Sequence, residues 1–407
     1  MITMVFGLVA TFLCDKFSKE AEGSGIPQIK TFLSGLKLNN YLNARSYFVK
    51  MAGLILVDGG GFFTGKEGPL IRLSAMIARK IMEFSYFSKI SKNSFLRNQM
   101  MIVSVAAGVV STFGASYGGL MFAIEICTTT FLIANLWRAF VCATIVKILY
   151  TYINSSDGLD IFVDLQNVDL LSSSMLTHSV MLGLLGGWLG SLWIYTFCKL
   201  QRLKEWSRLL SNRYLWMALV GLVISLINFK LPTSYIGGKT LLKSLFYEKN
   251  LMDLNLGDSG RADIYFTLLF LSFLSRYVIT LLFASSPIPN GIFLPSLVIG
   301  ALFGRLYGEF VAIDNPGNDP RIFAMIGAAS FASSITRTTS TVLVICEITE
   351  NSTIIVGLLI GVTVAYSTSN LFTKSFFDTV LALKKLPYLP ILFRSDIYKL
   401  KAKQVCH

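Results

Sequence analysis

The stretch PIPNGIFLP, residues 287–295, interrupts a run without charged residues that extends from residue 277 to residue 304. A run of this length is enough to cross a membrane, whose hydrocarbon core takes about 20 helical residues. Proline and glycine break helices, and inside a bilayer the freed backbone groups need partners from protein or from a water-filled cavity. The stretch therefore predicts a membrane helix that is broken where it lines a site.

The composition indicates several membrane crossings. Of the 407 residues, 53% are hydrophobic and 14% are charged, whereas soluble domains carry about 25% charged residues. Further uncharged apolar runs cover residues 180–198 and 352–372. Residues 1–14 lack the basic leader and the cleavage site of a signal peptide, and we interpret them as part of a membrane helix. We expect a multi-pass integral protein of the plasma membrane or of an endomembrane.

The formal net charge of +13 is the one feature that suggests a nucleic-acid partner. The basic residues, however, form short clusters between apolar runs, at residues 89–97, 199–213 and 384–403. Such clusters are typical of the flanks of membrane helices, where they also contact anionic lipid. We therefore predict membrane lipid, and no nucleic acid, as a partner. Two histidines and scattered cysteines without a CxxC pair predict no metal site.

Two further segments have the glycine and proline content of the first break. They read GSGIP at residues 23–27 and GKEGP at residues 65–69. Interrupted segments in both halves of a membrane protein are typical of a midplane binding site between inverted repeats. A helix that begins at such a break directs backbone amides and a partial positive charge into the site. An anion is the ligand that this arrangement favours.

A nucleotide-binding loop is an alternative interpretation of the second segment. Residues 60–66 have the GxxxxGK spacing, but Glu67 stands where the loop requires a magnesium-binding serine or threonine. A carboxylate at this position would repel phosphates. The sequence also offers no nucleophile–base pair, so we predict that the chain is not an enzyme and uses no cofactor.

Together with LPYLP at residues 386–390, these motifs follow the order and approximate spacing of the CLC family of chloride channels and chloride/proton exchangers. The chain resembles this family from about residue 23 to residue 390. The resemblance implies an all-α membrane protein with CLC-type inverted repeats of tilted and broken transmembrane helices, and one pore in each subunit of a homodimer. Relative to the family, we expect the opening helices and the cytoplasmic CBS domains to be missing.

The same resemblance predicts how the chain is organised. We expect an N-terminal membrane half at residues 1–153 and a connecting loop at 154–178. A C-terminal membrane half at residues 179–392 and a short basic tail at 393–407 follow.

The resemblance also implies a chloride site. Its anion-binding positions are Ser24, Gly25, Ile26, Gly68, Ile292, Phe293 and Phe377. The hydroxyl of Ser24 donates to a central chloride, which suits conduction because a neutral donor binds an anion without trapping it. Serine at this position indicates chloride rather than nitrate. The alternative for Ser24 is a helix cap. Ile292 and Phe293 contribute backbone amides, and their side chains are expected to pack.

Glu67 is the gate that the resemblance implies. Its carboxylate occupies the outer anion site when ionised and moves away when protonated. An ionisable side chain at membrane depth is expensive to bury, at least about 2.5 to 3.5 kcal/mol on insertion scales, and usually functional. The alternative is an exposed loop glutamate that pairs with Lys66.

Two positions depart from the family pattern. Similar members have a tyrosine before the aspartate of the last helix, where this chain has Phe377. Loss of that hydroxyl removes about 1.5 to 3 kcal/mol of anion binding. Exchangers usually have adjacent glutamates, whereas here Ile126 follows Glu125, so the proton-relay position is lost. We predict a passive chloride channel; the alternatives are a chloride/proton antiporter and a non-conducting remnant that regulates a related subunit.

Overall fold

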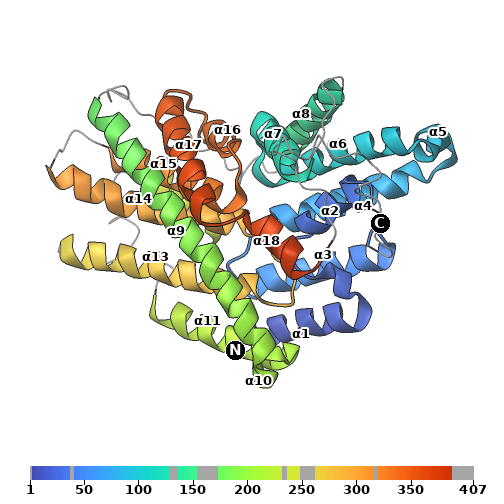
Figure 1. Ribbon diagram of the computed structural model, residues 1–407, viewed down its shortest axis with the longest axis horizontal. Coiled ribbons are helices and arrows are strands. Elements are labelled where there is room, and N and C mark those ends of the chain that lie inside the picture. The colour runs from blue at the N-terminus through green and yellow to red at the C-terminus, as the bar shows by residue number, and fades with distance from the viewer. Residues whose placement is uncertain are drawn as a thin grey trace, which may run out of the picture.

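The computed structural model describes residues 2–36, 41–128, 135–153, 173–231, 236–247, 262–314 and 319–386. Within these ranges every regular element is a helix (Figure 1). Five stretches are long and apolar enough to cross a membrane: Leu136–Ile153, Ser174–Trp206, Phe266–Ala284, Phe293–Ile313 and Ile355–Leu383. The predicted all-α membrane protein is confirmed.

The first half of the described chain holds eight α-helices and two short 3-10 turns. They are α1 (Ile2–Phe17), η1 (Lys19–Ala21), α2 (Ile26–Leu33), α3 (Ala44–Gly59), α4 (Glu67–Met82), η2 (Ser85–Phe87), α5 (Ser88–Lys92), α6 (Ser94–Phe113), α7 (Ser116–Cys127) and α8 (Leu136–Ile153).

The second half holds the remaining helices of the described residues. They are α9 (Ser173–Trp206), α10 (Arg208–Ser211), α11 (Arg213–Lys230), α12 (Gly238–Tyr247), α13 (Ala262–Ala284), α14 (Phe293–Asp314), α15 (Pro320–Thr336), α16 (Thr341–Thr349), α17 (Ile355–Phe372) and α18 (Phe376–Leu383). In Figure 1, α13, α14 and α15 lie to the left and α3 to α6 to the right, while the long helix α9 runs diagonally across the front. The last helix, α18, packs against α2 from the opposite end of the chain.

The broken helices begin where the sequence predicts them. Pro27 lies in the first turn of α2, Pro69 in the first turn of α4 and Pro295 in the first turn of α14. Proline is tolerated there because the first amides of a helix have no intrahelical partner, and its fixed φ suits the helix start. Each motif therefore ends one segment of chain and starts a helix.

The breaks of the two halves are joined through their backbones. The amide of Gly23 donates to the carbonyl of Ile288 at 3.1 Å, and the amide of Gly65 donates to the carbonyl of Gly291 at 3.0 Å. Groups that the breaks remove from helices thus find partners within the protein, as a membrane interior requires. These bonds place all three motifs in one region.

Helices α7 and α16 cap one another. Glu125, in the last turn of α7, accepts the backbone amides of Thr339 at 2.8 Å and Ser340 at 3.0 Å, at the start of α16. Glu347, near the end of α16, accepts the amides of residues 116–118 at 2.6 to 3.0 Å, at the start of α7. Carboxylates are stabilising at helix N-termini. Both glutamates therefore have a structural role, and the exchange of caps connects the two halves.

Some predicted boundaries fall outside the described residues or differ from them. The connecting loop was predicted at residues 154–178, but α9 already begins at Ser173, because residues 173–178 contain neither glycine nor proline to delay the helix. Residues 154–172 of that loop, the LPYLP motif beyond residue 386 and the tail at 393–407 lie outside the description.

Replacing Glu347 with glutamine tests the exchange of caps. We expect the free energy of unfolding to fall by about 1 to 3 kcal/mol, because charge-assisted bonds to buried amides are lost. The measurement is the thermal unfolding midpoint of the purified protein in detergent. Glu83→Gln is the control, since Glu83 forms only half-exposed ion pairs with Arg79 and Lys80. An equal shift in both variants would count against the capping role.

Candidate functional site

Ser24 lies in the loop that leads into α2. It is 8% exposed, and its hydroxyl oxygen accepts the amide of Ile26 at 3.4 Å. This distance exceeds the usual range for N–H···O bonds, so Ser24 is a poor cap. A hydroxyl that accepts a bond still has its own hydrogen to donate. The geometry leaves Ser24 available as a donor to a guest in the adjoining cavity.

The backbone carbonyls around Ser24 accept hydrogen bonds from two buried basic residues and a tyrosine. Lys50 is fully buried and donates to the carbonyls of Ala21 at 3.0 Å and Gly23 at 2.7 Å. The hydroxyl of Tyr41 donates to the carbonyl of Gly25 at 2.7 Å. Because the carbonyls of Ala21, Gly23 and Gly25 each accept a hydrogen bond from a buried side chain, the loop has a fixed shape.

Arg72 of α4 completes this support. Its guanidinium donates to the carbonyl of Glu20, to the carbonyl of Tyr41 at 2.7 Å and to the hydroxyl of Ser46 at 2.7 Å. It also stacks on the ring of Tyr41 at 3.9 Å. Arg72 is fully buried, so a full positive charge lies close to the Ser24 loop. Lys50, Tyr41 and Arg72 belong to none of the motifs, so the sequence gives no signal of their role.

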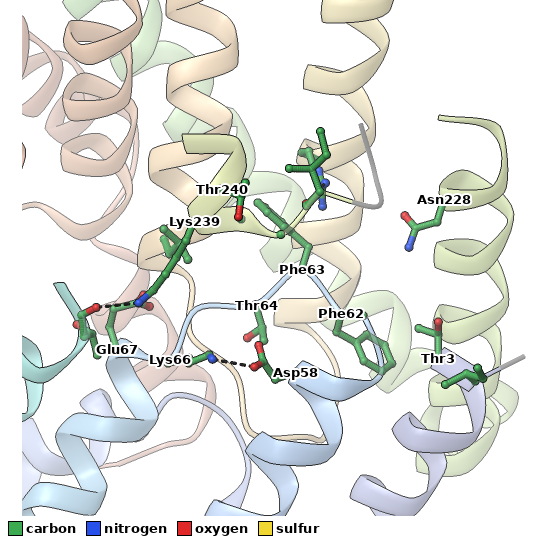
Figure 2. Close-up of a pocket in the computed structure, with 18 of the residues that line it drawn as sticks. Thr3, Asp58, Phe62, Phe63, Thr64, Lys66, Glu67, Asn228, Lys239 and Thr240 are labelled. Atoms are coloured by element: carbon green, nitrogen blue, oxygen red, sulfur yellow. Dashed lines mark hydrogen bonds and ion pairs between the residues drawn. The ribbon is translucent and has the colours of Figure 1, made fainter. Parts of the chain in front are cut away.

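Glu67 is the first residue of α4 and is 2% exposed. Its Oε2 atom is buried and has no hydrogen-bond partner among the residues that the structure describes. Lys66 instead pairs with Asp58, at 2.7 Å between Nζ and Oδ2 (Figure 2). The alternative of an exposed glutamate paired with Lys66 is therefore wrong.

The motifs are in direct contact. A Cβ atom on Gly68 would lie 2.6 Å from the Cβ of Ser24, and one on Gly291 would lie 3.1 Å from Oε2 of Glu67. Real Cβ atoms do not approach so closely at Gly68, so its glycine is needed for α4 to pack on the Ser24 loop. The structure thus brings GSGIP, GKEGP and GIFLP together around one point.

The predicted anion-binding residues of GIFLP and of the last helix are buried. Ile292 and Phe293 are 3% and 2% exposed, and the ring of Phe293 packs against Phe113 and Phe122 at 5.3 and 4.3 Å between centroids. Phe377, in the first turn of α18, is 2% exposed. Packing thus accounts for the aromatic side chain of GIFLP.

Helix α18 is tied to α2 by charge. Lys30 of α2 forms an ion pair with Asp378 of α18, at 2.6 Å. The hydroxyl of Ser375 accepts the amide of Asp378 at 3.1 Å and so caps α18. Helices α2, α4, α14 and α18 therefore form one packed group, in which α2 contacts α4 and α18, and α4 contacts α14. Their amides supply partial positive charge without a cation.

Two cavities border this group and share no lining residue. The Glu67 cavity has a volume of 780 Å³; its wall includes Glu67, Lys66, Lys239 and Leu294. The Ser24 cavity has a volume of 410 Å³; its wall includes Ser24, Gly23, Lys204, Lys384 and Phe376.

The structure separates some predicted residues from these cavities. Phe376, rather than the predicted Phe377, lines the Ser24 cavity. Ile126 is 4% exposed on α7 and lines neither cavity. Lys239, which no motif predicted, enters the Glu67 cavity and donates to the carbonyl of Thr112 at 3.2 Å (Figure 2).

Replacing Tyr41 with phenylalanine tests the support of the loop. The Gly25 carbonyl would lose its buried donor, and we expect about 1 to 3 kcal/mol less stability. Amide hydrogen exchange at residues 23–26, followed by mass spectrometry, should become faster. Tyr214→Phe is the control, because that hydroxyl makes only an exposed 3.3 Å contact with Asp15. Unchanged exchange in Tyr41→Phe would show that the loop does not depend on this bond.

Known proteins are similar to this chain over nearly its whole length. The family model of the voltage gated chloride channel matches residues 6–370. Chloride channel protein E of Dictyostelium discoideum is 30% identical over 412 residues, which cover 99% of this chain and 41% of that protein. Human Chloride channel protein 2 is 30% identical over 435 residues, which cover 95% and 47%. The chain thus spans less than half of these relatives.

Solved structures share the fold. The crystal structure of a eukaryotic CLC transporter superposes with a TM-score of 0.82 at 31% identity, over 97% of this chain and 67% of that one. A slow cyanobacterial Cl⁻/H⁺ antiporter superposes with a TM-score of 0.79 at 21% identity, over 94% and 86%. These likenesses confirm the fold predicted from the sequence.

Proposed function

This chain belongs to the CLC family of voltage gated chloride channels and transporters, and on that premise we propose that it is a passive chloride channel gated by Glu67. The family consists of multi-pass membrane proteins that move ions and are not enzymes, as the sequence predicted. No cofactor is expected, and chloride is the transported ligand.

The burial of Glu67 is the observation that carries the proposal. A carboxyl at the start of α4 faces the positive end of that helix, and one of its oxygens has no partner among the described residues. An ionised carboxylate there competes with a chloride ion for the same amides and dipole. Protonation removes its charge, so the attraction to the helix end falls and an anion can replace it. Glu67 also lines the larger cavity, which gives it room to move.

The Ser24 loop and the start of α14 form the other part of the proposed pathway. Ser24 offers a hydroxyl, and Ile292 and Phe293 offer backbone amides, so chloride meets donors without a full counter-charge. Such binding is weak enough for release, which conduction requires. Phe377 has no hydroxyl to add a donor, which favours faster release. The fixed shape of the loop behind Ser24 keeps these donors in place.

Passive conduction is favoured over proton exchange by the surroundings of Ile126. Its side chain cannot carry a proton. The neighbouring carboxylates, Glu125 and Glu347, are bound to the amides at two helix starts and are therefore fixed in structural roles. A proton relay needs a carboxylate that is free to change partners.

One observation favours the antiporter as the second candidate. Glu22 lines the Ser24 cavity and lies two residues from Ser24. Its carboxylate offers an alternative place for a proton near the pathway. Burial raises the pKa of the Glu22 carboxyl above its ordinary value and so favours a proton there, whereas the ion pair with Arg213 acts in the opposite direction.

We further infer a homodimer with one pore in each subunit. Helices α8 and α17 support it, because only 11% of the apolar stretch of α8 and 28% of the stretch from α17 into α18 is buried within the chain. Their remaining surface is available for lipid or for a second copy.

The first test is chloride efflux from liposomes that contain the purified protein, with a pH electrode recording protons. We expect chloride flux without coupled proton movement. Glu67→Gln, which mimics the protonated gate, should conduct and lose most of its dependence on pH, whereas the exposed control Glu83→Gln should behave as the wild type. Stoichiometric proton uptake would identify an antiporter, and absence of flux from folded protein would favour a regulatory remnant.

Adding a hydroxyl at the last helix tests the anion site. Phe377→Tyr should tighten chloride binding by about 1.5 to 3 kcal/mol, because it restores a donor to a charged acceptor. The measurement is isothermal titration of the purified protein with chloride. Phe376→Tyr is the matched comparison, since Phe376 lines the Ser24 cavity. Tighter binding by Phe376→Tyr alone would transfer the role to that position.

A further inference from the structure

Asp58 lies in the last turn of α3 and lines the same cavity as Glu67. Its carboxylate forms an ion pair with Lys66 at 2.7 Å, and the two side chains are 50% and 46% exposed (Figure 2). Lys66 precedes Glu67 in the chain. A carboxylate at the C-terminal end of a helix faces the negative end of the helix dipole, which is unfavourable. Asp58 therefore does not stabilise α3. Its electrostatic effect acts on Lys66.

The charged groups on the wall of the Glu67 cavity show what this ion pair changes. The described residues contribute three cations, Lys66, Lys239 and Arg276, and two carboxylates, Asp58 and Glu67. The formal charge of the wall is thus 3 − 2 = +1 with both carboxylates ionised. Without the charge of Asp58 it would be 3 − 1 = +2.

The other two cations, Lys239 and Arg276, bind backbone carbonyls near the cavity wall. Lys239 donates to the carbonyl of Thr112 at 3.2 Å. Arg276 donates to the carbonyl of Ile236 at 3.1 Å and lies over the ring of Phe63 at 4.1 Å. Lys66, in contrast, has a side chain that is nearly half exposed and a carboxylate partner. Asp58 thus acts on the cation that is best placed to attract anions from solvent.

A third cavity, which is apolar, strengthens the electric field of the ion pair in the Glu67 cavity. Asp58 and Lys66 also line an apolar cavity of 430 Å³ between α3, α4 and α6. Its wall includes Ile55 and Ile77, which are 66% and 46% exposed on the outside of the protein. The ion pair therefore has a wall of low dielectric constant on one side and the Glu67 cavity on the other. Low-dielectric walls concentrate the field of a charge into the adjoining aqueous space.

From this geometry we propose that Asp58 limits the concentration of anions at the gate by neutralising Lys66. The inference rests on the proposed function, since it concerns the supply of chloride to Glu67. Loss of the carboxylate would add one positive charge to the cavity wall. A unit charge about 8 Å from an anion, at an effective dielectric constant of about 40 to 80, changes anion occupancy about two- to sixfold.

Equilibrium titration of the purified protein with chloride tests the inference without relying on conduction. Asp58→Asn should lower the chloride dissociation constant about two- to sixfold at low ionic strength, whereas the charge-preserving Asp58→Glu should match the wild type. The difference should shrink when an inert salt brings the ionic strength to about 1 M, where the screening length is about 3 Å. An unchanged constant in Asp58→Asn would overturn the inference.

Charge compensation provides the sharper control. Lys66→Gln should weaken chloride binding, because the wall charge falls to 2 − 2 = 0. The double variant Asp58→Asn/Lys66→Gln has a wall charge of 2 − 1 = +1, as in the wild type, and should recover its dissociation constant. A double variant that binds as tightly as Asp58→Asn alone would show that Asp58 does not act through Lys66.

Chloride efflux from liposomes, measured with the same variants, separates the two claims. Changed binding in Asp58→Asn together with absent flux in every variant would support the role of Asp58 and refute the channel. Flux in the wild type with identical binding in all variants would refute only the role of Asp58. The side chains are half exposed, so all four variants should retain the thermal unfolding midpoint of the wild type.

Discussion

The need to pair backbone groups inside a membrane governs this structure. Glycine and proline break the helices at three motifs, and each break frees amides and carbonyls in a medium that offers no water. The amides of Gly23 and Gly65 are satisfied by carbonyls at residues 288 and 291 of the other half. The same bonds that satisfy the breaks also hold the halves together, so the site and the fold have one origin.

Side chains bind the backbone carbonyls of the Ser24 loop on one side, and the Ser24 cavity borders the loop on the other. Lys50, Tyr41 and Arg72 engage the carbonyls around the Ser24 loop. With its acceptors occupied, the loop presents a hydroxyl and the start of α2 to the Ser24 cavity. The buried guanidinium of Arg72 also favours a negative guest. In the proposed site the carbonyls of the break are bound on one side, while Ser24 lines the cavity on the other.

Carboxylates in this protein differ in function because they differ in their partners. Glu125 and Glu347 each accept several amides at a helix start and hold α7 against α16. Glu67 is equally close to a helix start, yet one oxygen has no partner within the described chain. Asp58 lines the Glu67 cavity and pairs with a single lysine. The four carboxylates therefore differ in the number of fixed donors that hold them.

The sequence by itself determined the membrane class, the broken helices and the motif residues, because apolar length, proline and glycine act locally. It also predicted the family fold, since four motifs in order restrict the arrangement strongly. Only the tertiary structure decided which groups meet: that Lys66 pairs with Asp58 and not with Glu67, that Lys50 and Arg72 support the Ser24 loop, and that Phe376 lines a cavity. These pairings join residues distant in sequence or choose between neighbours, and local patterns carry no information about such contacts.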